Sequence, residues 1–332
     1  MIRIFTTVIL AAFVLYGAYW FVGKSSKEAG IESWLSERAD AGWIAESDVN
    51  LRGFPNRYDA VLRDLNLADP NSGWAWRAPE FELIQLTYKP NHFIALWPET
   101  QIISSPEQKI DVTSDELRAS VIFEPRSDFT LDRATLTSNA IDLKSTQNWG
   151  LSADDLVLAI RQAETGETDY DLAIKAANFS PSTSLLSQID RTGLMPRSFE
   201  TFEMNAIASF NEKLSRESFN NGSGDLQNVE LQAFNLAWGE LLLRAAGDFR
   251  VDSEGYPTGR ITVRAENWEL MLDMAIAGGF VDENLGSTLR SGLGLLARFS
   301  GNANTLDAPL TFSGRQTKLG PITLGPAPRL KL

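Results

Sequence analysis

Side chains that could bind an apolar molecule are concentrated in one stretch of the sequence, residues 74–97. The stretch holds three tryptophans and three further aromatic residues, which are Trp74, Trp76, Phe81, Tyr88, Phe93 and Trp97. Their rings could form a platform for a lipid chain or another apolar ligand. The alternative is that these large rings fill the core of a sheet, which is the commoner place for them.

Two arginines, Arg57 and Arg77, each stand near an aromatic residue in the sequence. A guanidinium group can hold the phosphate of a lipid headgroup, because its planar donors match two phosphate oxygens. It can equally form an ordinary salt bridge that supports the fold. The six aromatic residues and these two arginines together make up the candidate ligand-binding site.

No arrangement of residues in the sequence indicates a catalytic centre. His92 is the only histidine, and as a general base it would also need a nucleophile and a carboxylate nearby. The sequence has no Gly-x-Ser-x-Gly motif to supply that nucleophile, so we expect His92 to be a structural turn residue. Acidic residues are numerous but scattered, so a hydrolase with two carboxylates stays an alternative. We expect no catalytic residue and no enzyme activity.

Residues 292–297 match the dinucleotide-binding pattern Gly-x-Gly-x-x-Ala. That pattern acts at the turn from a strand into a helix, whereas here it lies within a leucine-striped helical segment. We therefore expect its glycines to let a helix pack closely. The sequence has no P-loop, His-Glu-x-x-His pair or EF-hand loop, so we expect no cofactor and no metal.

The composition excludes several other kinds of site. The 332 residues include 30 Lys and Arg, 43 Asp and Glu, a single His and no Cys, and the net charge is −13. Without cysteine there is no disulfide, thiolate nucleophile or iron–sulfur cluster, and one histidine cannot make a multi-histidine metal site. The acidic balance argues against nucleic acid as a partner.

Residues 5–22 form an uncharged, mostly apolar run. As a helix this run rises about 27 Å, close to the roughly 30 Å hydrocarbon core of a bilayer. Arg3 and Lys24 flank it, and aromatic residues gather at its second end as they do at membrane interfaces. The alternative is a cleaved signal peptide, but the run offers no small-x-small cleavage site. We therefore predict that residues 1–27 are an uncleaved signal anchor with one transmembrane helix.

The bulk of the chain is expected outside the cytoplasm. Positive charges on the two sides of the anchor balance, but long C-terminal domains cross a membrane largely regardless of charge. Removing Arg3, Lys24 and Lys27 from the 30 basic residues leaves 27 against 43 acidic ones, a net charge of −16 for the body. Any contact of the body with an anionic membrane must therefore be apolar or locally basic.

Beyond the anchor, the hydrophobic pattern is mostly that of β-strands. Residues 28–45 have helical spacing and should end near Gly42, after which apolar and polar residues alternate. Strands are expected at residues 46–51, 57–67, 81–88, 93–97, 117–123, 129–131, 134–143, 156–160, 170–176, 229–236, 240–251, 259–265, 310–312 and 319–324. Helices are expected at residues 184–189, 198–216, 267–277 and 282–299. Asn267 is expected to cap the helix at 267–277.

These elements predict an α+β fold that is mainly antiparallel β. We expect an elongated sheet, curved into a groove, with helices packed on it and one N-terminal transmembrane helix. Residues 28–332 lack a linker of the kind that separates domains, so they are expected to form a single elongated β-rich domain. A subdivision near residues 181–225 is the alternative.

Several short segments carry a resemblance to a known family. They are residues 53–58 (Gly-Phe-Pro-Asn-Arg-Tyr), 74–79 (Trp-Ala-Trp-Arg-Ala-Pro), 88–92 (Tyr-Lys-Pro-Asn-His), 319–322 (Leu-Gly-Pro-Ile) and 324–328 (Leu-Gly-Pro-Ala-Pro). From about residue 30 to the end, the chain resembles domain-of-unknown-function family 2125 (DUF2125) of membrane-anchored alphaproteobacterial envelope proteins. The resemblance implies an inner-membrane protein with a periplasmic body and no known activity.

A more distant resemblance is to AsmA-like envelope proteins, through the order of helices and strands and the Gly-Pro-Ile tail. Those proteins build long β-grooves that handle lipids, so the likeness implies a lipid or hydrophobic ligand. The function expected first is therefore a membrane-anchored periplasmic module that binds such a ligand. The alternative is a structural envelope protein that docks another envelope protein and binds no ligand.

Overall fold

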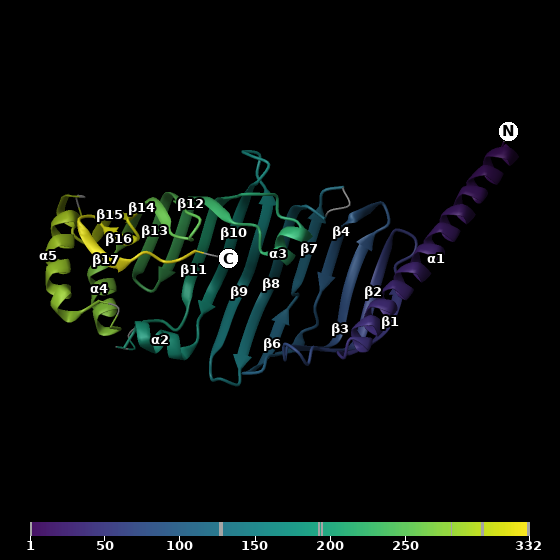
Figure 1. Ribbon diagram of the computed structural model, residues 1–332, viewed down its shortest axis with the longest axis horizontal. Coiled ribbons are helices and arrows are strands. Elements are labelled where there is room, and N and C mark those ends of the chain that lie inside the picture. Colours follow the sequence, from purple (N-terminus) through teal and green to yellow (C-terminus); the bar gives the residue numbers. More distant parts are fainter. Residues whose placement is uncertain are drawn as a thin grey trace. The chain divides into compact units, whose positions relative to one another are not determined.

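Most of the chain folds into antiparallel β-structure (Figure 1). The computed structural model describes residues 2–125, 129–191, 193, 195–279, 281–299 and 302–330. Strands hold 52% of the residues, which confirms the predicted α+β class with mainly antiparallel strands. The chain forms two units: Met1–Ile122 with Leu143–Asn148, and Phe123–Asp142 with Trp149–Leu332.

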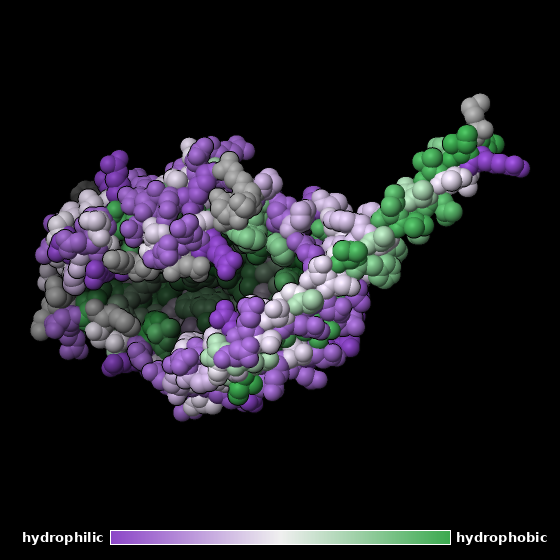
Figure 2. Space-filling model, turned by 45° about the vertical axis from the view of Figure 1, so that its right-hand side comes forward, coloured by the Kyte–Doolittle hydropathy of each residue, from purple (hydrophilic) through white to green (hydrophobic). Residues whose placement is uncertain are grey.

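The N-terminal helix α1 (Ile2–Asp40) is continuous from the apolar run to the first strand. It is long and apolar enough to cross a membrane, and Figure 2 shows the exposed apolar side chains of its first part in green. The helix ends as predicted, because Gly42 has a φ of 87° and donates its N–H to the carbonyl of Ala39. No linker therefore separates the apolar run from the folded first unit.

The first unit is built on strands that branch at β3. The strands are β1 (Ile44–Arg52), β2 (Arg57–Ala68), β3 (Ala75–Leu86), β4 (Lys89–Leu96), β5 (Thr100–Ser104), β6 (Lys109–Asp115) and β7 (Arg118–Phe123). β1, β2 and β3 pair antiparallel in order. On its other edge, β3 pairs with β4 through residues 82–86 and with β5 through residues 75–77. β4 then pairs with β7, and β5 with β6.

α1 packs on β1 and β2 through the end of its apolar run. Trp20 is 3% exposed and is buried together with Leu51, Tyr58 and Ala60. About three helical turns after Trp20, Ile31 packs against the same cluster. The same helix therefore carries both the apolar run and part of the core of the first unit.

The second unit is an antiparallel sheet in which each strand from β9 to β17 pairs with the next. The strands are β9 (Gly150–Gln162), β10 (Asp169–Ser180), β11 (Phe199–Phe210), β12 (Leu226–Trp238), β13 (Leu241–Val251), β14 (Pro257–Glu266), β15 (Thr305–Ser313), β16 (Gln316–Leu319) and β17 (Ile322–Pro326). β8 (Leu131–Ser145) divides between the units at Asp142.

Helices cover part of this sheet. They are α2 (Thr183–Ile189), α3 (Arg216–Asn221), α4 (Trp268–Ala277) and α5 (Glu283–Phe299). α4 and α5 contact one another, and α5 lies on β15 (Figure 1). Trp268, Leu289 and Leu293 are buried with Ala308 of β15 in the core that these elements share.

Residues 198–216 are predicted as one helix, but residues 199–210 form strand β11. Every second residue from Phe202 to Phe210 is apolar, and Ala206 and Ala208 are buried. The segment also holds alanine, methionine and glutamate, which favour helices, but pairing with β10 and β12 outweighs that local preference.

Two smaller predictions were also wrong. Asn267 does not cap α4 with its side chain: its φ is 58°, and its Nδ2 donates to the carbonyl of Glu240. The segment 319–324 is not one strand, because Gly320, with a φ of 57°, turns the chain between β16 and β17.

Candidate functional site

Four of the eight predicted site residues line one cavity in the first unit. This tryptophan cavity has a volume of about 510 Å³. Its lining includes Trp43, Leu67, Trp74, Trp76, Phe81, Trp97, Gln101 and Ile103. Trp74 is 55% exposed at its rim, so the cavity is open to a molecule from outside. In this cavity Trp76, Phe81 and Trp97 are half-buried and Trp74 is exposed, so the four rings form an accessible wall.

The rings of the tryptophan cavity are held in contact. The ring centroids of Trp76 and Phe81 are 5.2 Å apart, and those of Phe81 and Trp97 are 5.5 Å apart. The indole Nε1 of Trp76 donates to Oε1 of Gln101 at 2.7 Å, and Gln101 is buried. The only buried polar group of Trp76 is thus satisfied, and the rest of the ring is free to present an apolar face.

The contact between Trp76 and Phe81 requires an irregular strand. Residues five apart on a regular strand point to opposite faces of the sheet. On the neighbouring strand β2, Asp64 has a φ of 51°, between the paired positions Arg63–Glu80 and Leu65–Ala78. The register of β2 on β3 continues unbroken across Asp64, and Leu67 and Trp76 line the same cavity as Phe81.

Trp43 is a member of this cavity that the sequence analysis did not identify. It lies between the end of α1 and the start of β1, and the guanidinium of Arg38 lies 5.2 Å from its ring centroid. The register of β1 on β2, which pairs Ile44 with Ala68, places Trp43 at the same end as the turn before Trp74. Only a correct strand pairing could have predicted this neighbour.

The turn at the rim carries an ionised carboxylate. Asp69 accepts hydrogen bonds from the hydroxyl of Ser72 at 2.7 Å and from the backbone N–H of Asn71 at 2.9 Å. These donors hold the pKa of Asp69 below its ordinary value. The mouth of the tryptophan cavity is therefore polar and its wall apolar.

Phe93 lies in a second cavity of the first unit, of about 270 Å³, between α1 and the sheet. We call it the helix cavity; its lining includes Lys27, Ile31, Trp34, Leu51, Tyr58, Leu83 and Phe93. Lys27 Nζ lies 5.2 Å from the ring centroid of Tyr58, and burial lowers the pKa of Lys27. Burial also raises the pKa of Tyr58. Leu83 lines this cavity and Phe81, two residues along β3, lines the tryptophan cavity, so both open on one face of the strand.

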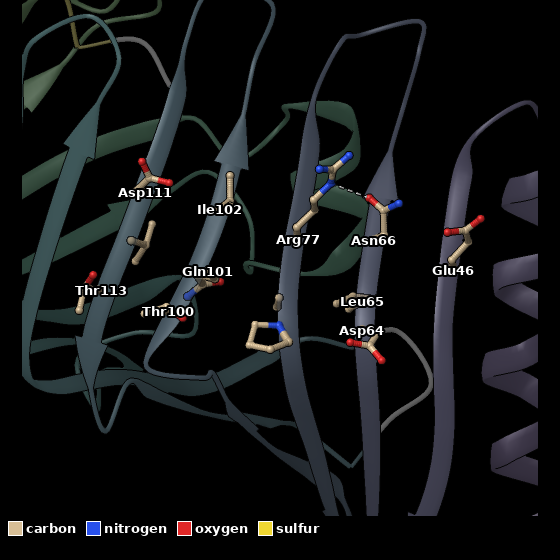
Figure 3. Close-up of a pocket in the computed structure, with 13 residues that line it drawn as sticks. Glu46, Asp64, Leu65, Asn66, Arg77, Thr100, Gln101, Ile102, Asp111 and Thr113 are labelled. Atoms are coloured by element: carbon tan, nitrogen blue, oxygen red, sulfur yellow. Dashed lines mark hydrogen bonds between the residues drawn. The ribbon is translucent and has the colours of Figure 1, made fainter.

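Arg77 lies in a different, polar pocket of about 600 Å³ (Figure 3). Its Nε donates to Oδ1 of Asn66 at 3.1 Å. Three carboxylates, those of Glu46, Asp64 and Asp111, line the same pocket. An excess of acid over base disfavours a phosphate there. Among the described residues, no group of three or more His, Asp or Glu could hold a metal ion.

Arg57 and Tyr88 line neither apolar cavity. Arg57 Nε pairs with Oδ2 of Asp59 at 2.9 Å. Tyr88 is 68% exposed in the turn between β3 and β4. The structure thus brings four candidates together and distributes Phe93, Arg77, Arg57 and Tyr88 over other parts of the first unit.

The second unit also has an apolar cavity, of about 410 Å³. Its lining includes Trp149, Leu151, Phe179, Leu185, Phe199 and Phe202. The ring centroids of Phe179 and Phe199 are 5.9 Å apart, and the rings are stacked. Figure 2 shows apolar side chains, in green, on the recessed surface of this unit at the left of the view. The sequence pattern predicts no site here.

The family model "Uncharacterized protein conserved in bacteria (DUF2125)" matches residues 20–328 of the chain. The chain belongs to the DUF2125 family. The match begins at Trp20, the residue by which α1 packs on the first unit, so it includes the second half of this helix. No curated protein and no solved structure matches the chain. The more distant AsmA-like resemblance stays a prediction.

His92 of this DUF2125 protein is on strand β4, so its prediction as a turn residue was wrong. Its Nε2 is hydrogen-bonded to Oγ of Ser120 on β7, at 2.8 Å. The bond joins two paired strands. The residue pattern had suggested a turn because Pro90 and Asn91 precede it, but β4 begins before them at Lys89.

Residues 292–297 lie inside helix α5, as predicted, so they do not form a nucleotide-binding turn. A methyl group at Gly294 would meet the ring of Trp268 at 4.0 Å, an ordinary contact. We expect Gly294→Ala to raise the free energy of unfolding by about 0.5–1 kcal/mol, because alanine favours a helix over glycine. Denaturant unfolding of the purified chain measures this change.

Gly286→Ala is the control for that prediction. Its added methyl would lie 2.5 Å from Cδ1 of Ile276, so part of the gain in helix propensity would be lost to crowding. A destabilised Gly294→Ala would contradict the packing assigned to α5.

Proposed function

We propose that this protein is a membrane-anchored protein of the bacterial envelope that binds a lipid or similar hydrophobic ligand in the tryptophan cavity. The observation that carries the proposal is the wall of Trp43, Trp74, Trp76, Phe81 and Trp97 around about 510 Å³ of open volume. This volume is within the roughly 300–1,000 Å³ range of small-molecule sites. Rigid aromatic walls with few polar groups suit an acyl chain better than a polar metabolite.

The position of the helix cavity favours a ligand that comes from the membrane. Leu83 and Phe81 connect the two cavities along one face of β3. The helix cavity itself lies against α1, the helix that could cross the bilayer. An apolar surface therefore continues from the helix toward the tryptophans, and an acyl chain moving along it would remain out of water.

The proposed location is the inner membrane, with α1 as its single span and the folded units in the periplasm. The basis is the length of the chain that follows the anchor, since long C-terminal domains cross regardless of flanking charge. The absence of cysteine is compatible with this compartment.

The test is native mass spectrometry of the full chain, purified in mild detergent, compared with Trp74→Ala. We expect co-purified lipid on the wild-type chain and about tenfold weaker binding in the variant, because the loss of one aromatic contact costs about 1.4 kcal/mol or more. Its stability should change little, since Trp74 is largely exposed.

Leu158→Ala is the matched control, because Leu158 is an exposed apolar residue on β9 of the second unit. It should retain the wild-type lipid. A wild-type chain without lipid, even after incubation with a membrane lipid extract, would refute the proposal and favour the docking role. If equal amounts of lipid co-purified with the wild type and with Trp74→Ala, the lipid would bind outside the tryptophan cavity.

A further inference from the structure

Two loops of the first unit lie beside the apolar run of α1. The first, residues 53–57, joins β1 to β2 and includes the first residue of β2. The second, residues 87–90, joins β3 to β4 and includes the first two residues of β4. We call these two segments the loop edge. Tyr16 Oη on α1 donates to the carbonyl of Pro55 at 3.0 Å and lies 3.2 Å from Oγ1 of Thr87. Thr87 Oγ1 in turn donates to the carbonyl of Asn56. One tyrosine within the apolar run thus joins both loops.

Phe54 sets the depth of the loop edge along the helix. Its ring lies 6.4 Å from that of Phe13, 5.3 Å from that of Trp20 and 6.0 Å from that of Phe21, measured between centroids. Phe13 and Phe21 both belong to the uncharged run 5–22. Phe54 therefore stands beside the second half of the run, the half toward the end at which a helix crossing a bilayer leaves the hydrocarbon.

The chemistry of the loop edge differs from that of the rest of the body. Phe54 is 43% exposed and Tyr88 68% exposed. Lys89 follows Tyr88, and Lys24 follows the apolar run on α1. The body as a whole carries a net charge of −16. Exposed aromatic rings next to lysines are typical of the interfacial layer of a bilayer, where rings lie at the headgroup level and ammonium groups reach phosphates.

We propose that the loop edge is a membrane-contact surface, seated in the interfacial layer of the same bilayer that α1 crosses. Phe54 and Tyr88 lie at the boundary of headgroups and acyl chains, and Lys89 faces the lipid phosphates. The continuous helix fixes this arrangement, because no linker lets the first unit move away from the membrane. The inference needs α1 to span the bilayer but does not need the tryptophan cavity to bind lipid.

The test uses the absence of cysteine, which lets one introduced cysteine carry the only label. Tyr88→Cys carries an environment-sensitive dye on the full chain in phosphatidylethanolamine and phosphatidylglycerol vesicles. Glu107→Cys, exposed in the turn between β5 and β6 of the same unit, carries the same dye as the control. Both positions are at loop tips, so their local mobility is comparable.

We expect the dye at position 88 to shift its emission to the blue and to lose most of its intensity to spin-labelled lipids with a shallow quencher. Iodide in the water should quench it little. The dye at position 107 should be quenched strongly by iodide and little by the spin-labelled lipids, with no blue shift. Equal iodide quenching at both positions, with no lipid quenching at 88, would overturn the proposal, and circular dichroism of both proteins checks that they are folded.

Discussion

Trp20→Ala should release α1 from the first unit, with a loss of about 3–5 kcal/mol in the free energy of unfolding. The side chain is 3% exposed and stacks on Tyr58 with a centroid distance of 5.7 Å. It also meets Phe54 edge to face, and its Nε1 donates to the carbonyl of Arg57 at 3.0 Å. Alanine would leave a large cavity and an unpaired carbonyl together. Thermal unfolding of the full chain in detergent micelles, followed by circular dichroism, measures the loss.

Tyr19→Ala is the control, because Tyr19 is the adjacent residue of the same helix and is 59% exposed. It should change stability by less than about 1 kcal/mol. Trp20→Phe should fall between the two, since it keeps one aromatic ring but loses the hydrogen bond, worth about 1 kcal/mol, and part of the buried indole. If Trp20→Ala were no less stable than Tyr19→Ala, the packing of α1 on the first unit would be incorrect.

Gly247→Ala should destabilise the second unit by about 3 kcal/mol or more. Gly247 has a φ of 149°, a conformation that residues with a side chain rarely adopt. A methyl group here would lie 2.8 Å from Cα of Ile261 on β14, and nearer still to the carbonyl oxygen of Arg260. The obstacle is backbone, so no change of rotamer relieves it, and β13 would have to move away from β14.

The matched control is Gly294→Ala, the same substitution at a helical position of the same unit with free space. Chemical unfolding of both variants against the wild type should give changes of opposite sign. Gly247→Ala should also lose near-ultraviolet dichroism if the strands separate around Ile261, which is buried with Phe312. A Gly247→Ala variant as stable as the wild type would contradict the close approach of β13 and β14.

The sequence predicted those parts of the fold that depend on local pattern. The alternation of apolar and polar residues at 170–176 and 259–265 was sufficient to predict β10 and β14. Gly42 was sufficient to predict the end of α1. β11 was missed because residues 199–210 combine helix-favouring side chains with an alternation that only neighbouring strands stabilise. Local preference and sheet pairing conflicted there, and pairing determined the structure.

The candidate site was predicted in part for the same reason. Trp74 and Trp76 are near in sequence, and Trp97 joins them because the branch at β3 brings the region after β4 alongside. Arg77 could have been separated from the site in advance, since neighbours on a strand point to opposite faces. The contact between Phe81 and Trp76 could not be predicted from the sequence, because residues five apart on a regular strand point to opposite faces.

The length of β1 gives the tryptophan cavity a fixed height. The strand joins the loop at residues 53–57 to Trp43, and its residues Ile44–Arg52 extend over roughly 30 Å. With the loop edge on the bilayer, as proposed, the cavity would lie at most about one strand length from the lipid headgroups. A lipid bound there, as proposed, would lie outside its leaflet. Under the two proposals, a partner that takes up this lipid would have to reach the same distance from the membrane.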